Sequence, residues 1–335
     1  MRAVITGIGH HLPQRRVSTG EVERLVSQNG GFAIPPGLIQ LLTGVRERYW
    51  AAEDEATSDL AAAAAGKALE NAGVHPMSLD LLICASASHD MAEPSTAAIT
   101  QSKIGCRNAA TMDVKSACNS FINGLDVAAS MIETGRATTV LVTAGEVISP
   151  VIDWYITGMA QLRRKFAGLT LGDAAGAVVV QAHDAPDGRG VLPGDFMTDG
   201  EFWELCTVRF GGSRQRVTLG GLFDCRSDEL AKLALQHLPD LFGKVLERVG
   251  WRSDDVALVV PHQVSRAVIV DLARRWDYPL DRCMITVDRF GNTAAASIPL
   301  ALSMAAEAGR ISRGDKVILV GGAAGFSAGV VPIVW

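Results

Sequence analysis

The chain contains an internal duplication, and no other sequence feature limits so strongly the folds that it can adopt. At one offset the second half repeats the first: Asp80 aligns with Asp254, Ser88 with His262, Cys118 with Asn292, and residues 133–136 (ETGR) with 307–310 (EAGR). A three-residue slip also aligns 68–73 (ALENAG) with 245–250 (VLERVG). The repeat predicts two similar α/β halves, each with a strand that ends and a helix that begins near the middle of the molecule.

The same duplication predicts where the chemistry is concentrated. Packing two such halves about a pseudo-twofold axis places Cys118, His262 and Asn292 in one cleft, although they lie far apart in the sequence. A thiol, an imidazole and a carboxamide then converge. The expected boundary lies near residue 180, so that residues 1–180 carry the cysteine and residues 181–335 carry the histidine and the asparagine.

Apolar periodicity predicts that strands and helices alternate in both halves. In the first half the expected strands are 1–10, 80–86, 110–115 and 139–145, and the expected helices are 57–73, 94–104 and 119–133. In the second half the expected strands are 256–261, 284–288 and 316–321, and the expected helices are 228–249, 264–275 and 293–308. This rhythm favours mainly parallel sheets that are covered by helices on both faces.

Two segments lie outside the duplication. Residues 151–168 are amphipathic and are expected to form a cap, and residues 181–225 mix glycine, proline and aromatic residues. Extra segments on a duplicated core usually build a substrate pocket or cover it.

Composition excludes several classes of function. The 335 residues are 48% hydrophobic and carry a net charge of −5, which argues against nucleic acid or an anionic membrane surface as the main partner. No stretch approaches the roughly 18 apolar residues of a membrane-spanning helix, and the N-terminus lacks the apolar core of a signal peptide. We therefore expect a cytoplasmic protein that does not insert into a membrane.

The six cysteines show no CxxC pair, which argues against a disulfide framework and against a zinc site. The glycine-rich stretches lack the spacing of a dinucleotide fingerprint, so neither a metal nor a bound cofactor is expected. Cys84 is expected to be a small buried residue. No functional role is expected for the four that have no base-like neighbour in the sequence, which are Cys106, Cys206, Cys225 and Cys283.

Cys118 differs from the other cysteines because a helix is expected to begin just after it. Unpaired backbone N–H groups and the positive end of the helix dipole favour a thiolate at such a position. Cys118 is therefore the candidate nucleophile.

Three further residues are candidates for stabilising a developing negative charge. His262 ends an apolar strand in the motif PHQ, and Asn292 follows Gly291 at a strand-to-helix turn. Both are expected to donate hydrogen bonds to an enolate or carbonyl oxygen. Gly325 lies in a glycine-rich turn, where its backbone N–H and that of Cys118 could form an oxyanion hole for a thioester.

Taken together, these motifs resemble the β-ketoacyl synthase III family of the thiolase superfamily over nearly the whole chain. The motifs are TGIGHHLP (6–13), TGVRER (43–48), SAC (116–118), GDAAGA (172–177), PHQ (261–263), FGNTAAASIP (290–299) and the glycine-rich C-terminal segment. The resemblance implies a homodimer with a five-layered αβαβα fold. It also implies that Cys118 accepts an acyl group from acyl-CoA or acyl carrier protein, after which a second thioester attacks to form a C–C bond.

Within this family the segment 86–98 is most similar to the OleA type, which joins two acyl-CoA molecules without decarboxylation. In that type a glutamate before the proline enters the active site of the partner subunit, and Glu93 matches it. Removal of a proton from a plain acyl thioester needs such a base. Condensation with a malonyl thioester does not need such a base, because the loss of CO₂ generates the carbanion.

The sequence departs from the family where the starter enzymes bind CoA. Leu42 stands at the position of an arginine that stacks on the adenine, and the matching tryptophan is absent from 35–42. The remaining candidates to bind CoA phosphate or a carrier protein are Arg46, Arg48, Arg163 and Arg164.

Four alternatives to an OleA-like condensation stay open at this stage. The first is decarboxylative synthase III activity, and the second is acyl transfer to an oxygen or nitrogen acceptor in secondary metabolism. The third is a non-catalytic subunit of a heterodimeric synthase, although such subunits commonly lose one of the three reactive residues. The fourth is a papain-like protease, against which the duplication and the missing protease signature argue.

Overall fold

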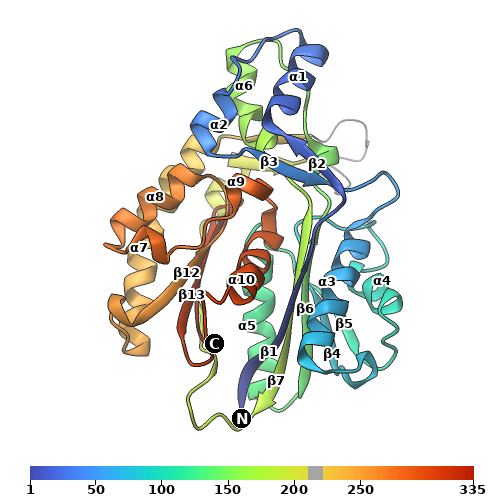
Figure 1. Ribbon diagram of the computed structural model, residues 1–335, viewed down its shortest axis with the longest axis vertical. Coiled ribbons are helices and arrows are strands. Elements are labelled where there is room, and N and C mark those ends of the chain that lie inside the picture. The colour runs from blue at the N-terminus through green and yellow to red at the C-terminus, as the bar shows by residue number, and fades with distance from the viewer. Residues whose placement is uncertain (210–221) are drawn as a thin grey trace.

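The computed structural model describes residues 1–209 and 222–335, and its core is formed by two five-stranded sheets (Figure 1). In the first sheet the order is β1-β7-β6-β4-β5. Its strands are β1 (Arg2–His11), β4 (Leu81–Cys84), β5 (Ala110–Asp113), β6 (Thr139–Glu146) and β7 (Ala174–His183). In the second sheet the order is β12-β13-β14-β8, and β9 also pairs with β14. Its strands are β8 (Gly190–Val191), β9 (Asp195–Thr198), β12 (Val256–Pro261), β13 (Lys316–Ala323) and β14 (Ser327–Val334).

The sheets are mixed, and this corrects the expectation of mainly parallel sheets. Strands β4, β5 and β6 are parallel, but β7 runs antiparallel to both of its neighbours, β1 and β6. In the second sheet only β12 and β13 are parallel, and β14 runs antiparallel to β13. A short turn joins β13 to β14, and the segment between β6 and β7 includes helix α6 (Met159–Lys165), but in both halves the chain returns to pair in the opposite direction.

Helices and sheets form five layers. Helices α3 (Thr57–Ala72) and α4 (Thr96–Lys103) cover the outer face of the first sheet, and α7 (Ser227–Val249) and α8 (Arg266–Arg275) cover that of the second. Helices α5 (Ser120–Glu133) and α10 (Ser297–Glu307) lie between the two sheets. The predicted αβαβα fold of two duplicated halves is therefore confirmed.

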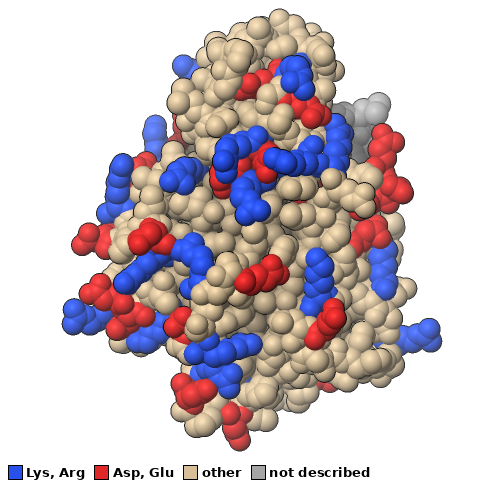
Figure 2. Space-filling view, viewed as in Figure 1, with Lys and Arg blue, Asp and Glu red and all other residues tan. Residues whose placement is uncertain are grey.

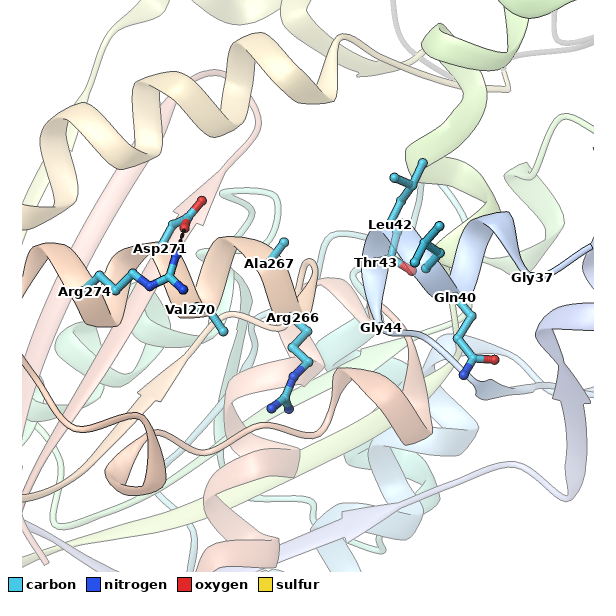
Figure 3. A pocket seen from close by; sticks show the side chains of 11 residues that line it. Gly37, Gln40, Leu42, Thr43, Gly44, Arg266, Ala267, Val270, Asp271 and Arg274 are labelled. Carbon is cyan, nitrogen blue, oxygen red and sulfur yellow. Dashed lines mark hydrogen bonds and ion pairs between the residues drawn. The ribbon is translucent and has the colours of Figure 1, made fainter. Parts of the chain in front are cut away.

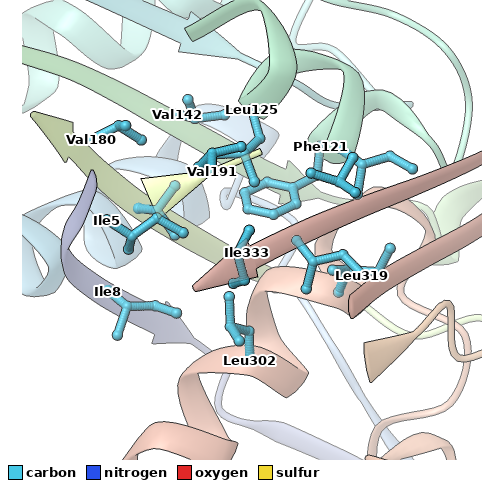
Figure 4. Packing of buried hydrophobic residues seen from close by; sticks show 14 of the residues in the cluster. Ile5, Ile8, Phe121, Leu125, Val142, Val180, Val191, Leu302, Leu319 and Ile333 are labelled. Carbon is cyan, nitrogen blue, oxygen red and sulfur yellow. The ribbon is translucent and has the colours of Figure 1, made fainter. Parts of the chain in front are cut away.

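The central layer explains why the halves pack as one unit. A single cluster of buried apolar side chains joins both sheets to α5 and α10, and it includes Phe121, Leu302, Leu319 and Ile333 (Figure 4). Most residues of helix α5 are buried, including Phe121, Leu125 and Ile132, because both sheets contribute to the cluster that covers it. Burial of these side chains stabilises the halves only when they are packed together.

The prediction of a strand at 284–288 is wrong. Cys283, just before this segment, makes one isolated parallel bridge with Val259, and the segment then enters the short helix α9 (Val287–Phe290). The bridge occupies the place that β5 occupies beside β4 in the first half. The duplication therefore persists in the topology, although the regular strand has been lost.

A smaller group of elements caps one end of the layered core, at the top of Figure 1. It contains α1 (Thr19–Gly30), α2 (Leu38–Thr43), α6 (Met159–Lys165) and the paired strands β2 (Arg15–Ser18) and β3 (Glu47–Trp50). Residues 151–168, the predicted cap, contribute α6 to it. Of the other predicted insertion, residues 210–221 lie outside the described residues, and the flanking strands β10 (Cys206–Val208) and β11 (Phe223–Cys225) pair with each other.

No helix in the described part of the chain is long and apolar enough to cross a membrane.

Candidate active site

A cavity of about 570 Å³ lies where the two halves meet, and Cys118, His262 and Asn292 all line it. The remaining walls are mainly apolar and come from the loop after β4, from α7 and from the pair β10–β11. The structure thus brings together the three side chains that the duplication predicted to converge.

Cys118 sits on a tight turn between β5 and α5. The turn is held by backbone hydrogen bonds from Asn119 to Ser116 and from Ser120 to Ala117. Ala117 has a φ of 47°, which is uncommon for a residue with a side chain and marks local strain. The strained turn presents the cysteine at the start of the helix.

The protonation state of Cys118 is opposite to the one expected from its place at a helix N-terminus. Burial, reinforced by the charge of the nearby Glu146, raises the pKa of the Cys118 thiol to about 12. The cysteine is therefore a neutral thiol at pH 7, and it must lose its proton as it attacks.

His262 directly follows β12, where its backbone N–H donates to Val320 O at 2.7 Å. Its Nδ1 lies 2.7 Å from Ser297 Oγ at the start of α10. Burial lowers the pKa of His262 to about 4, so the imidazole is neutral at pH 7. Because Ser297 can either donate or accept, the contact allows Nε2 to act as an acceptor or as a donor.

Asn292 lies in the loop between α9 and α10. Its backbone N–H donates to Thr170 O at 2.9 Å, and its Oδ1 accepts from Ala294 N at 3.0 Å. Because Oδ1 is engaged, the amide N–H of Asn292 is the group available to donate to a ligand in the cavity.

Gly291 fixes the position of this asparagine. Its φ is 67°, and a Cβ there would lie 2.3 Å from Thr170 O. Gly291→Ala is expected to lower the free energy of unfolding by about 2–4 kcal/mol and to lower kcat at least about tenfold because Asn292 is displaced. Thermal melts and steady-state kinetics test this.

Gly309→Ala is the matched control, because Gly309 has a φ of 64° but no heavy atom lies within 4 Å of the position that a Cβ would take there. Gly309→Ala should lower the free energy of unfolding only by the cost of a left-handed backbone at alanine, and it should leave kcat unchanged. Equal effects of the two substitutions on kcat would argue against the positioning role of Gly291.

Glu146, at the end of β6, is a functional candidate that sequence reasoning missed. Its Oε1 accepts from Ala87 N at 2.7 Å and Ala295 N at 3.3 Å, and its Oε2 accepts from Ser88 N at 2.9 Å and Ser88 Oγ at 2.7 Å. Burial raises its pKa to about 7 in spite of these four donors. The available signal was a glutamate that ends the buried run TVLVTAG.

Four other residues that line the cavity were also missed. Lys115 and His89 lie at one side, with Lys115 Nζ 3.2 Å from His89 Nδ1. Cys206 and Cys225 lie in the wall formed by β10 and β11. No sequence signal marks these two cysteines, because the pairing of their strands depends on the tertiary structure.

Two predicted residues lie beside the cavity rather than in its wall. Gly325 has a φ of 95° in the turn between β13 and β14, and its neighbours Ala324 and Phe326 line the cavity. Glu93 is exposed, whereas the preceding Met91 and Ala92 line the cavity of the same chain. The predicted role of Glu93 concerns the partner subunit and stays a prediction.

The prediction that Arg48 contacts CoA is wrong. Its side chain is fully buried and donates to Thr19 Oγ1 at 3.2 Å and to Leu169 O at 3.0 Å. It therefore braces the loop before β7 and does not reach a ligand.

The other predicted arginines are exposed. Arg46 pairs with Asp288 at 2.5 Å, and Arg164 pairs with Asp224. Arg163 is exposed on α6. Figure 2 shows Lys and Arg side chains gathered over β2, β3 and α9, with acidic residues among them.

A surface groove of about 750 Å³ lies between α2 and α8 (Figure 3). Leu41 and Leu42 are 80% and 52% exposed there, and Arg266 and Arg274 of α8 also line it. The groove combines exposed apolar side chains with basic ones.

The five-layered duplicated fold, with a thiol, an imidazole and a carboxamide in one cavity, defines a condensing enzyme of the thiolase type. A family model described as 3-oxoacyl-[acyl-carrier-protein (ACP)] synthase III matches residues 112–200, and the model of its C-terminal part matches residues 246–335. The chain belongs to the β-ketoacyl-[acyl-carrier-protein] synthase III family, and it is an acyltransferase that catalyses a Claisen condensation.

Two curated relatives bear the name β-ketoacyl-[acyl-carrier-protein] synthase III. The protein of Rhizorhabdus wittichii is 37% identical over 99% of both chains. That of Cereibacter sphaeroides is 36% identical over 100% of this chain and 99% of its own.

Solved structures include both types of enzyme. Synthase III from Aquifex aeolicus has a TM-score of 0.88 and 30% identity, covering 99% of this chain and 100% of its own. Xanthomonas campestris OleA E117A has a TM-score of 0.90 and 27% identity, covering 100% and 98%. OleA is therefore similar to this chain but no closer than synthase III. These comparisons do not favour the OleA type, which the segment 86–98 had suggested, over synthase III.

Proposed function

We propose that this enzyme condenses an acyl group on Cys118 with a malonyl thioester by decarboxylation. The observation that carries the proposal is the pairing of a neutral His262 with the free amide N–H of Asn292 beside the thiol. Among the described residues that line the cavity, Asp90 is the only carboxylate, and it accepts from Ser58 N at 2.9 Å and Ser58 Oγ at 2.6 Å. Two neutral donors without a free base suit decarboxylation.

In the first step the Cys118 sulfur attacks the carbonyl carbon of the acyl thioester. The thiol proton passes to His262 Nε2 and then to the departing thiolate, so that an acyl-cysteine and a free thiol result. The backbone N–H groups of Cys118 and Gly325 are the proposed donors to the oxyanion.

In the second step the malonyl thioester loses CO₂, and the electrons of the broken C–C bond form an enolate. Between the two steps the imidazole exchanges its tautomer with solvent, so that Nδ1 accepts from Ser297 Oγ, and His262 Nε2–H and Asn292 Nδ2–H then donate to the enolate oxygen. The enolate carbon attacks the acyl-cysteine, the C–S bond breaks, and the Cys118 thiolate takes up one proton. The products are a β-ketoacyl thioester, CO₂ and the free enzyme.

The names of the relatives support an acyl carrier protein as one substrate carrier. We place its docking at the groove between α2 and α8, where Leu41, Leu42 and Arg266 combine apolar contact with positive charge. Such a surface suits an acidic protein. With Leu42 in place of the adenine-binding arginine, this route is favoured over one that depends on the CoA nucleotide.

The apolar cavity wall supports acyl groups longer than acetyl. Ala231 of α7 lines this wall, so Ala231→Phe is expected to fill part of the cavity. Acylation by a decanoyl thioester should fall about 10–100-fold while acetylation changes less than about threefold. Intact-mass time courses of the Cys118 adduct measure both rates, and an equal loss of both would contradict this placement of the acyl chain.

A second candidate function is OleA-like condensation without decarboxylation, and Glu93 favours it. This function requires a homodimer in which Glu93 enters the cavity of the other subunit. The edge strand β5, whose residues are partly exposed, is available for such an assembly.

One experiment separates the two candidates. The enzyme is incubated with an acyl-CoA alone, or together with malonyl-acyl carrier protein, and the products are weighed. A β-ketoacyl product that requires malonyl thioester, and that persists in Glu93→Gln, supports the decarboxylative reaction. A product formed from acyl-CoA alone and lost in Glu93→Gln would overturn it in favour of the OleA-like reaction.

A further inference from the structure

Two cysteines face each other across the short ribbon of β10 and β11. Cys206 lies directly opposite Cys225 in the antiparallel register. The preceding pair, Leu205 and Arg226, is joined by the hydrogen bond from Arg226 N to Leu205 O at 2.7 Å. Because bonded and non-bonded pairs alternate along such a ribbon, the two cysteines form a non-hydrogen-bonded pair.

This position suits a disulfide. The Cα atoms of a non-hydrogen-bonded pair lie about 4.5 Å apart, within the range of about 4.4–6.8 Å that a disulfide requires. The thiols are also in side-chain contact, because a hydrogen bond to Cys225 is the largest cause that raises the pKa of Cys206. Both sulfurs are therefore close enough to bond without a change of strand register.

Both thiols line the cavity that contains Cys118, so a small oxidant that enters the cavity reaches them. Cys206 is half-buried and Cys225 is buried in the cavity wall, whereas Cys84, Cys106 and Cys283 do not line the cavity and pack within apolar clusters. Among the described residues, Cys206 and Cys225 are the one cysteine pair matched in register across two strands.

We propose that Cys206 and Cys225 are a redox-active pair that peroxide oxidises to a disulfide in the cavity wall. One thiol attacks hydrogen peroxide to give a sulfenic acid and water, and the second thiol displaces the hydroxyl group to give the disulfide and a second water. Two thiols and one peroxide thus yield one disulfide and two waters. A dithiol reductant reverses the reaction by exchange.

The pair closes in preference to oxidation of Cys118. Because the second thiol is held next to the first, a sulfenic acid formed on either one is trapped by an intramolecular step, and we expect the disulfide to accumulate about tenfold faster than a modified Cys118. Oxidation therefore alters the cavity wall and leaves the nucleophile intact.

The test uses the full chain treated with stoichiometric hydrogen peroxide, denatured, alkylated and weighed. The six cysteines should accept four labels after oxidation and six after dithiothreitol, and a peptide map should contain the Cys206–Cys225 cross-link and an alkylated Cys118. Disulfide formation should be faster at pH 9 than at pH 7, because the thiolate is the reactive form.

Two variants make the result decisive. Cys225→Ser should lose no pair of labels on oxidation, whereas Cys106→Ser, the control, should still form the cross-link. Six labels after oxidation of the native chain, or a cross-link that contains Cys118, would overturn the proposal. Because the native peptide map alone gives this answer, it holds even if a variant does not fold, and it does not depend on which condensation the enzyme performs.

Discussion

Replacement of Cys118 by alanine is expected to lower the rate of condensation by at least about 10⁴-fold. The reason is that the acyl-enzyme can no longer form, and the remaining cavity groups stabilise an enolate that has no acyl partner to attack. Intact-mass measurement after exposure to an acyl thioester should show no adduct on the variant, where the native chain gains the mass of one acyl group.

Cys106→Ala is the matched control, because Cys106 is 2% exposed and packs in a separate apolar cluster. Its loss removes one small buried group, so stability should fall by about 1 kcal/mol and acylation should persist. Retention of a thioester-derived adduct by Cys118→Ala would show that another residue is the nucleophile.

Substitution of Glu146 is expected to have the second largest effect. Its carboxylate ties together the loop of Ala87 and Ser88, which lines the cavity, and Ala295, which starts the approach to α10 beside Asn292. Glu146→Ala leaves these donors without an acceptor and should lower the free energy of unfolding by about 3–5 kcal/mol.

Glu146→Gln keeps the shape but points amide N–H groups at backbone N–H groups. We expect a loss of about 10–100-fold in kcat, with a smaller loss of stability than in Glu146→Ala. Asp80→Asn is the control, because Asp80 also accepts three hydrogen bonds between strand ends but lies away from the cavity. Kinetics that are equally affected in both variants would contradict a specific role of Glu146.

The pKa of Glu146 also predicts a pH dependence. Burial raises it from 4.5 in the unfolded chain to about 7, so the folded state binds the proton more tightly. The resulting stabilisation of about 3 kcal/mol is complete below pH 4.5 and is lost as the pH rises through about 7. The melting temperature of the native chain relative to Glu146→Gln should therefore fall between these pH values. A difference in melting temperature between the two proteins that stays constant with pH would contradict the raised pKa of Glu146.

The sequence supported a correct prediction of the fold because the duplication constrains both halves at once. Matching positions such as Cys118 and Asn292 each lie shortly before a helix of the central layer, and the two helices pack against the same core. The strand expected at 284–288 failed for a local reason: the chain lies beside β12 for one bridge and then turns into α9, and apolar periodicity over so short a segment does not distinguish a strand from a helix.

The candidate site was only partly predictable. Residue type and motif singled out Cys118, His262 and Asn292, which the structure brings to one cavity. Arg48 was misread as a surface residue, because a sequence does not show that its side chain turns inward to Thr19 and Leu169.

By itself the sequence determined the α/β duplication, the family and the identity of the three candidate side chains, Cys118, His262 and Asn292, since these depend on periodicity and residue type. The tertiary structure alone decided that Cys118 and His262 are neutral and that Cys206 faces Cys225. It also decided that the buried Glu146 accepts hydrogen bonds from two separate loops. The physical reason is that desolvation and hydrogen bonding act through space, between groups that the fold brings together from distant parts of the chain.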